Sequence, residues 1–217
     1  MKSVLTLVFL LLLCSVAAAQ EYPKAELFGG YSYLRTDSED IDLVAGNQVT
    51  TTRRHGGNLN GFNLSANYNP AKWLGIVIDF SGHYGSIDNT VIVPGTVNAT
   101  FGVRTNLHTL LGGPQFAWRG DNTTFFVRAL AGVGFQDQTL TLGGQKIADD
   151  RTAFAAAVGG GVDIKLTDTI SLRAAQVEYL LTRFGDQNIT INGQRLSASD
   201  TQHNLRISTG FVFRNRD

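Results

Sequence analysis

Residues 124–136 read Thr-Phe-Phe-Val-Arg-Ala-Leu-Ala-Gly-Val-Gly-Phe-Gln, and every second position from Phe125 to Phe135 is apolar. A period of two is that of a β-strand, in which successive side chains point to opposite faces of the sheet. The other face is mixed and carries Arg128 together with two glycines. Apolar side chains on one face, small or polar ones on the other and aromatic residues near the ends are typical of a strand in a transmembrane β-barrel.

The first residues of the chain predict export. Lys2 supplies a positive charge, residues 4–13 form an apolar run, and Ala17-Ala18-Ala19 offers a cleavage site. The apolar run is too short to cross a bilayer but has the length of a signal-peptide core. We therefore predict a cleaved signal peptide over residues 1–19 and one mature domain over residues 20–217.

Composition excludes several classes of function. The one cysteine, Cys14, lies inside the predicted signal peptide, so the mature chain has no disulfide and no thiol chemistry. Leu13 precedes it, where a lipoprotein would have a small residue. Removal of Lys2 leaves 17 basic against 18 acidic residues, which argues against a nucleic-acid-binding protein. With 24 glycines and only 4 prolines, the chain suits strongly curved strands.

The alternation of residues 124–136 recurs along the chain and predicts eight strands. In the fourth, Pro114 is awkward because proline cannot donate to a strand ladder. In the seventh, the alternation slips by one residue near Ala174-Ala175, which predicts a β-bulge there. The eight segments are residues 24–35, 59–68, 73–84, 104–118, 124–136, 152–166, 169–184 and 202–214.

The connections between these segments alternate in length. Short turns of two to five residues alternate with long polar stretches over residues 36–58, 85–103, 137–151 and 185–201. Within the long stretches, residues 90–93 and 188–191 favour strands and are candidates for hairpins above the membrane. The pattern predicts an all-β protein, an eight-stranded antiparallel up-and-down transmembrane barrel with short periplasmic turns and four long extracellular loops.

The sequence resembles the small eight-stranded outer-membrane barrels of the OmpA/OmpX type, in the group called outer membrane protein beta-barrel. The resemblance covers essentially the whole mature chain and implies a Gram-negative outer-membrane location without the peptidoglycan-binding domain of OmpA. In this family an aromatic end of the last strand is read by the barrel-assembly machinery, a role that falls here to Phe211 and Phe213. The matching motifs are residues 26–33, 61–63, 111–116, 159–163 and 211–213.

The resemblance also implies partners. These are outer-membrane lipid and lipopolysaccharide, the barrel-assembly machinery and periplasmic chaperones, together with an unidentified extracellular ligand of the loops. We expect a monomer and no nucleic-acid partner.

Charged residues on the inward face are the candidate functional constellation. An eight-stranded barrel is just wide enough for side chains to fill, and buried charges must pair. We therefore predict a balanced network that plugs the lumen, with Arg128 paired to Glu26 or Asp163 near the periplasmic end. The predicted inward charges are Glu26, Asp79, Arg128, Asp163, Lys165, Arg173, Glu178 and Arg206, with His83 beside them.

The favoured interpretation is a non-catalytic barrel with a structural or surface-interaction role. One alternative is a narrow, porin-like ion or water channel gated by the same charges. Another is a lipid A-modifying enzyme, and a third is a secreted soluble barrel of lipocalin type. The third is disfavoured because the apolar residues lie on the predicted outer face and the charges on the inner one.

A lipid A-modifying enzyme would need a serine and a histidine together on the outer surface. His108 has Thr109 beside it, but adjacent strand residues point to opposite faces. His203 has Ser199 nearby and no fixed acid to orient it. The sequence has no metal-binding spacing and no phosphate-binding glycine loop, so neither a cofactor nor a metal is predicted.

Overall fold

The computed structural model describes residues 22–37, 39–45, 48–54, 56–92, 99–142, 145–184, 187–191, 194–198 and 201–215. The predicted signal peptide lies outside these residues. Among them, no helix is long and apolar enough to cross a membrane. The strands of the barrel wall are β1 (Ala25–Thr36), β4 (Asn58–Ala71), β5 (Leu74–Ile92), β6 (Ala99–Arg119), β7 (Thr123–Leu142), β8 (Gln145–Lys165), β9 (Ile170–Phe184) and β12 (Thr201–Arg214).

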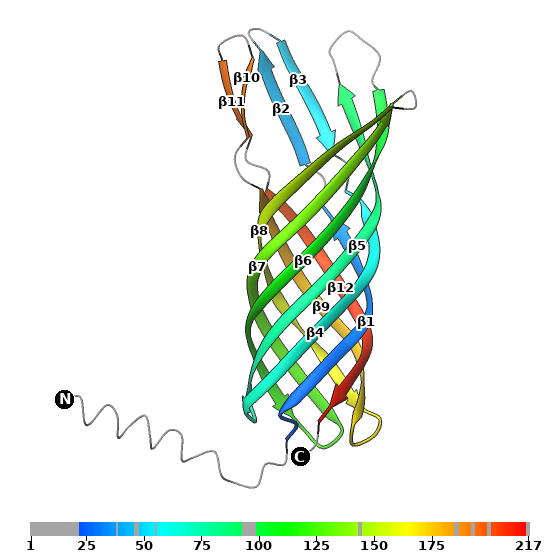
Figure 1. Cartoon of the computed structure of the whole chain (residues 1–217), viewed down its shortest axis with the longest axis vertical. Coiled ribbons are helices and arrows are strands. Elements are labelled where there is room, and N and C mark those ends of the chain that lie inside the picture. The colour runs from blue at the N-terminus through cyan, green and yellow to red at the C-terminus, as the bar shows by residue number, and fades with distance from the viewer. Residues whose placement is uncertain are drawn as a thin grey trace, which may run out of the picture.

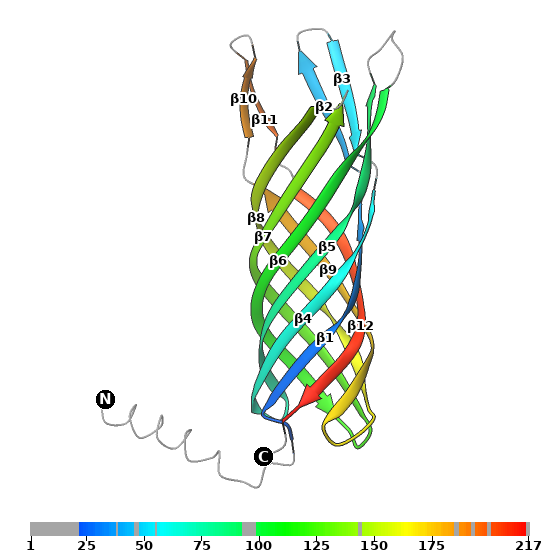
Figure 2. The ribbon, with the colours of Figure 1, turned by 45° about the vertical axis from the view of Figure 1, so that its right-hand side comes forward.

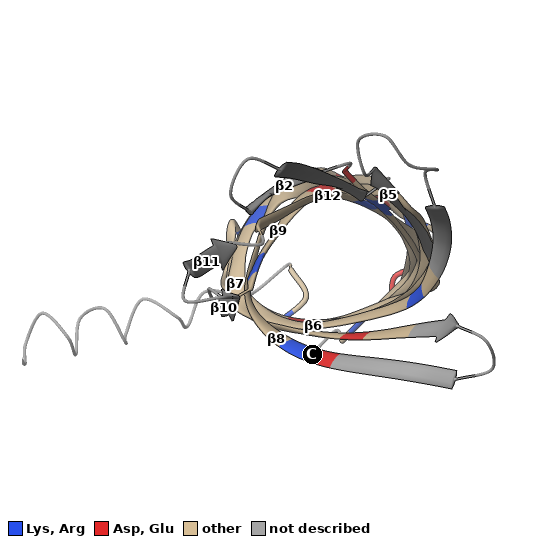
Figure 3. Ribbon diagram, turned by 90° about the horizontal axis from the view of Figure 1, so that it is seen from above, with Lys and Arg blue, Asp and Glu red and all other residues tan. Residues whose placement is uncertain are grey.

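These eight strands form a closed antiparallel ring, as predicted (Figures 1 and 2). Each strand pairs with the next wall strand along the chain, and β1 pairs with β12 to close the ring. Seen from above, the ring encloses a lumen and charged positions are spread around it (Figure 3). Short turns join β4 to β5, β6 to β7 and β8 to β9 at one end, which we call the turn end. The opposite end is called the loop end.

The hydrogen-bonded register determines how steeply the strands tilt. Starting at His203 on β12 and following paired residues once around the ring, the path returns to β12 at Phe213. The path has therefore moved ten residues along the strand, which is the shear of the barrel. A stagger of this size in eight strands requires a tilt of roughly 45° and leaves a narrow lumen.

The two faces of each strand are as predicted. On β7, Phe125, Val127, Val133 and Phe135 are exposed on the outer wall, whereas Phe126 and Arg128 are buried inside. Ten residues separate Phe125 from Phe135, which is about 33 Å along a strand and roughly 25 Å along the axis of a tilted one. The apolar band of an outer-membrane barrel has this height.

The strands run further beyond the band than predicted. The long polar stretches are largely hairpins, because β5 to β8 continue into them. The first stretch contains the hairpin of β2 (Glu39–Ala45) and β3 (Gln48–Arg54), and the last contains that of β10 (Gln187–Ile191) and β11 (Gln194–Ala198). The predicted hairpins at residues 90–93 and 188–191 fall largely within β5 and β10, although residue 93 lies outside the described residues.

The two irregularities of the sequence take different forms. At Ala174-Ala175 the register of β9 shifts against both β8 and β12, and both alanines face outward, which confirms the predicted bulge. Pro114 causes no shift. It lies within β6, paired with Ile76, and its side chain is exposed on the outer wall.

Glycines allow the strands to approach where a side chain would meet backbone. A Cβ on Gly132 would lie 2.1 Å from the carbonyl oxygen of Leu110 on the neighbouring strand. On Gly112, a Cβ would have its nearest neighbour at 3.6 Å. We predict that Gly132→Ala lowers the free energy of unfolding by about 1–3 kcal/mol, since the backbone must move.

The measurement is guanidinium unfolding in detergent micelles, followed by the migration of unboiled samples on gels. Gly112→Ala, one residue away across the β6–β7 pair, is the matched control and should unfold like the original chain. Equal stability of both variants would contradict the close-approach argument.

Candidate functional site

Four buried charged side chains form a ring across the middle of the lumen. Arg128 Nη2 lies 2.8 Å from Asp79 Oδ2, and Arg128 Nε lies 2.5 Å from Glu178 Oε1. Arg206 completes the ring, with Nη1 3.0 Å from Asp79 Oδ1 and Nη2 2.7 Å from Glu178 Oε2. All four side chains are fully buried. Each carboxylate therefore lies between two guanidinium groups, and the four charges balance. We call this set the central charge ring.

Strand alternation and tilt bring these residues together. They belong to β5, β7, β9 and β12, and each occupies an inward position of its strand. Only Arg206 and Glu178 are direct partners in the strand register. The other contacts cross the lumen, which side chains as long as arginine can span in a barrel this narrow.

Neutral side chains add hydrogen bonds to the ring. Asn63 Nδ2 donates to Asp79 Oδ2 at 2.8 Å, and Gln176 Nε2 donates to Glu178 Oε2 at 2.8 Å. Ser81 Oγ accepts from Arg206 Nη1 at 3.0 Å. These contacts add hydrogen bonds to both carboxylates and to Arg206, which helps to offset the cost of burying the charges, whereas Arg128 Nη1 and Arg206 Nη2 have no hydrogen-bond partner among the described residues.

A second charged cluster lies toward the turn end. Arg173 holds Asp163 with two hydrogen bonds, of 2.8 and 3.1 Å, and its guanidinium lies between the rings of Phe28 and Phe126 at 4.4 and 4.3 Å. Arg173 Nη1 also donates to Gln176 at 2.7 Å. Because Gln176 bonds to Glu178 as well, the two clusters form one connected network.

An apolar layer lies on the loop-end side of the central charge ring. Leu130 and Leu180 follow Arg128 and Glu178 by two residues on strands that run toward the loop end. They belong to a buried apolar cluster on the inner face of the barrel: Leu34, Leu59, Leu107, Leu111, Leu130, Ala155, Ala157, Leu180 and, nearer the turn end, Val77. His83 is buried beside this layer, where its Nε2 lies 2.9 Å from Ser32 Oγ.

Two sequence-based predictions about these charges are wrong. Arg128 pairs with Asp79 and Glu178 rather than with Glu26 or Asp163, which belong to the turn-end cluster. Lys165 does not join the network. Its Nζ lies 2.7 Å from Asp168 in the β8–β9 turn, where both side chains are partly exposed. Lys165 is the last residue of β8, so its long side chain can reach water instead of the lumen.

Two arginines of the turn-end cluster were missed. Arg119 Nη2 lies 3.6 Å from Glu26 Oε2, and Arg214 Nε lies 3.3 Å from Glu26 Oε1. Arg214 Nη2 is also 3.7 Å from Asp163. Sequence reasoning left Arg119 outside the fourth segment and placed Arg214 at the last position of the eighth, and counted neither among the inward charges. Each nevertheless continues the inward alternation of its strand, and that periodicity would have identified both.

The remaining candidate residues face outward. Phe211 and Phe213 are exposed on the outer wall near the end of β12, and their assembly role stays a prediction.

His108 is partly exposed while Thr109 is buried, so the two point to opposite faces. His108 Nε2 lies 3.0 Å from the Tyr84 hydroxyl, and His203 Nδ1 bonds to that of Tyr179. Ser199 lies outside the described residues. Among the described residues, no group of acidic, histidine or cysteine side chains is placed to hold a metal.

Comparisons with solved structures agree on the fold. Ail, the attachment invasion locus protein of Yersinia pestis, is 14% identical with a TM-score of 0.52, covering 88% of this chain and 99% of Ail. OprG from Pseudomonas aeruginosa is 15% identical with a TM-score of 0.53, covering 92% and 99%. The outer membrane protease OmpT from Escherichia coli is 8% identical with a TM-score of 0.51, covering 92% and 100%. Identities this low show the fold alone.

No curated protein matches the sequence. A family match is found, however, and it covers residues 5–213, nearly the whole chain, under the description outer membrane protein beta-barrel domain. The closed antiparallel ring and the outward-facing apolar wall are what that description requires. The chain belongs to the outer membrane protein beta-barrel family and is a protein of the bacterial outer membrane.

Proposed function

We propose that this protein is a non-catalytic outer-membrane barrel whose lumen is closed and whose activity lies at its surface. The observation that carries the first part is the central charge ring of Asp79, Arg128, Glu178 and Arg206, which spans the lumen with no exposed side chain. A path for ions through the barrel would have to separate these pairs.

The layers above and below support a closed lumen. An ion from the loop end would first cross the apolar layer, where a charge without partners is costly. It would then meet guanidinium and carboxylate groups that are already paired with one another. Removing one partner from such a buried pair costs about 3–5 kcal/mol. A narrow channel remains the alternative, and it is tested directly below.

The contacts of the described histidines support a non-catalytic protein. His83 and its partner Ser32 are both buried in the lumen, beyond the reach of a lipid substrate. On the outer wall, His108 and His203 bond to tyrosines rather than to a serine. The shared fold with OmpT does not transfer its protease activity, because fold and function are separable.

The strands beyond the membrane support a surface role. Pairing of β8 with β9 ends at Ala153 and Phe184, whereas pairing of β8 with β7 continues to Gln145 and Leu142. In the described part of the chain, residues 145–152 of β8 therefore have one paired edge and one open edge (Figure 1). An open strand edge can bind an extended peptide by adding a strand to the sheet.

We predict that the purified protein shows no single-channel steps in a planar lipid bilayer. The double variant Asp79→Ala, Arg206→Ala removes half of the central charge ring while the net charge is kept, and it should show conductance steps. The matched control is Lys165→Gln, Asp168→Asn, which removes an ion pair outside the lumen. Regular channel openings from the original chain would refute the closed lumen.

The central charge ring should also stabilise the barrel. Glu178→Gln leaves two buried guanidinium groups with one carboxylate between them, and we expect the free energy of unfolding to fall by about 3–5 kcal/mol. Lys165→Gln breaks only the partly exposed pair with Asp168 and should change the free energy of unfolding by less than about 1 kcal/mol. Unfolding by guanidinium chloride in detergent micelles measures the stability of both variants. Equal losses of stability would contradict the proposed role of the central charge ring.

The surface role is tested by shortening the β7–β8 hairpin. Replacing residues 139–148 with Asn-Gly, a favoured two-residue hairpin turn, removes half of the open edge and leaves the central charge ring intact. Bacteria that display the shortened chain should bind less to a panel of immobilised extracellular-matrix proteins and glycans. Both the original and the shortened chain should migrate as folded barrels on gels when the samples are not boiled. Undiminished binding after shortening, or no binding by the original chain, would count against the surface role.

A further inference from the structure

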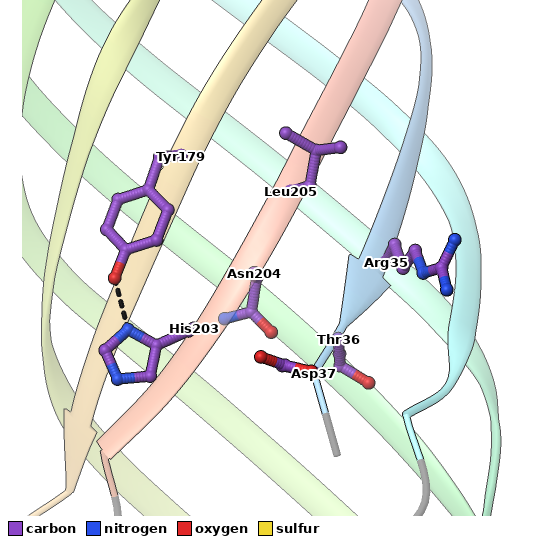
Figure 4. A pocket seen from close by; sticks show the side chains of 7 residues that line it. All are labelled: Arg35, Thr36, Asp37, Tyr179, His203, Asn204 and Leu205. Carbon is purple, nitrogen blue, oxygen red and sulfur yellow. Dashed lines mark hydrogen bonds between the residues drawn. The ribbon is translucent and has the colours of Figure 1, made fainter.

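A hollow of about 340 Å³ lies on the outer wall of the barrel at the loop end, across β9, β12 and β1. Figure 4 shows Tyr179 and His203 on one side of the hollow, Arg35 on the other, and Leu205 between them. These four side chains are exposed, whereas Thr36 and Asn204, which also line it, are buried behind the wall. The hollow therefore opens toward the membrane and not into the lumen.

The polar groups of the hollow are set for an anion. The Tyr179 hydroxyl is hydrogen-bonded to His203 Nδ1, and the two rings lie 5.8 Å apart. This contact holds the imidazole in place and leaves its Nε2 turned away from the tyrosine. In the part of the chain that the structure describes, no acidic side chain pairs with Arg35, which is exposed. Asp37 also lines the hollow and is exposed; its backbone N–H donates to the His203 carbonyl oxygen at 3.0 Å, and it has a further contact of its own.

The hollow lies at the outer boundary of the apolar band. Arg183, a second exposed arginine, is the register partner of Phe154 on β8 and of Thr201 on β12. Phe154 is exposed on the outer wall of β8, next to β7. On β7, Phe135 marks the loop end of the apolar band. Toward the turn end the same wall becomes apolar, with Ile207 and Val177 exposed. Aromatic residues mark the depth at which lipid headgroups begin.

A phosphorylated lipid has an apolar part and an anionic part, and this surface has a place for each. The apolar wall below the hollow suits acyl chains, and the cations at its rim suit the phosphate of a headgroup. A guanidinium binds phosphate with two parallel hydrogen bonds, which makes arginine the preferred partner for this group. A free anion would use only the rim and leave the apolar wall uncovered.

We propose that this hollow binds a phosphate group of an outer-leaflet glycolipid of the lipid A type. Arg35 binds the phosphate from one side and His203, held by Tyr179, from the other. The acyl chains lie along the wall of Leu205 and Ile207. The site is separate from the lumen, so it stands whether or not the lumen conducts.

The experiment is native mass spectrometry of the purified full chain in detergent, titrated with diphosphoryl lipid A. Dephosphorylated lipid A is the matched ligand, because it keeps the acyl chains and lacks the anion. We expect the diphosphoryl form to bind at least tenfold more tightly. Arg35→Gln should weaken its binding about tenfold, and Tyr179→Phe about threefold, as expected for losing a charge-assisted and a neutral hydrogen bond.

Arg104→Gln is the matched control variant. Arg104 is also exposed on the loop-end half of the wall, but on β6, which lies on the other side of the ring. This variant should bind diphosphoryl lipid A like the original chain. Unboiled gel migration identifies any variant that fails to fold, and Arg35→Lys, which keeps the charge, should retain most of the binding.

Three results would overturn the proposal. Equal binding of the two forms of lipid A would show that only the apolar wall is recognised. Equal losses from Arg35→Gln and Arg104→Gln would show a diffuse attraction of charges. Displacement of the lipid by millimolar inorganic phosphate would show that the hollow binds a free anion rather than a membrane lipid.

Discussion

The pairing of β1 with β12 is the constraint on which the rest of the molecule depends. Inside a bilayer every backbone donor and acceptor needs a partner within the protein, so a sheet can cross only if it has no edges. The register that closes this sheet shifts ten residues per circuit, which sets the tilt of the strands and the width of the lumen. A lumen of that width allows Arg206 on β12 to reach Asp79 on β5.

Because the lumen is narrow, its contents behave as a protein core made of layers. The turn-end cluster around Arg173, the central charge ring and the apolar layer around Leu130 follow one another along the axis. Gln176 joins the first two by bonding to Arg173 and to Glu178. Glycine positions such as Gly132 lie where the strands come closest, so the interior leaves little room for substitution. Networks with this many shared partners lose more than one contact when a member is removed.

The side chains on the outer wall change in kind along the barrel axis and not from one strand to the next. Exposed apolar side chains cover the band between Phe125 and Phe135, and cations such as Arg35 and Arg183 stand at its loop end. Beyond the band the strands continue into hairpins with an open edge. Contact with lipid and with the cell's surroundings is made by these outer regions.

The sequence by itself determined the number of wall strands, the facing of those strands, the alternation of short and long connections and the bulge at Ala174-Ala175. All of these depend on a period of two, which is local to each segment. Only the tertiary structure decided which residues pair with Arg128 and that Lys165 pairs with Asp168. It also decided that Arg119 and Arg214 pair with Glu26. Alternation tells which face a side chain occupies, but contacts across the lumen depend on the shear of the closed ring. That shear is a property of all eight strands together.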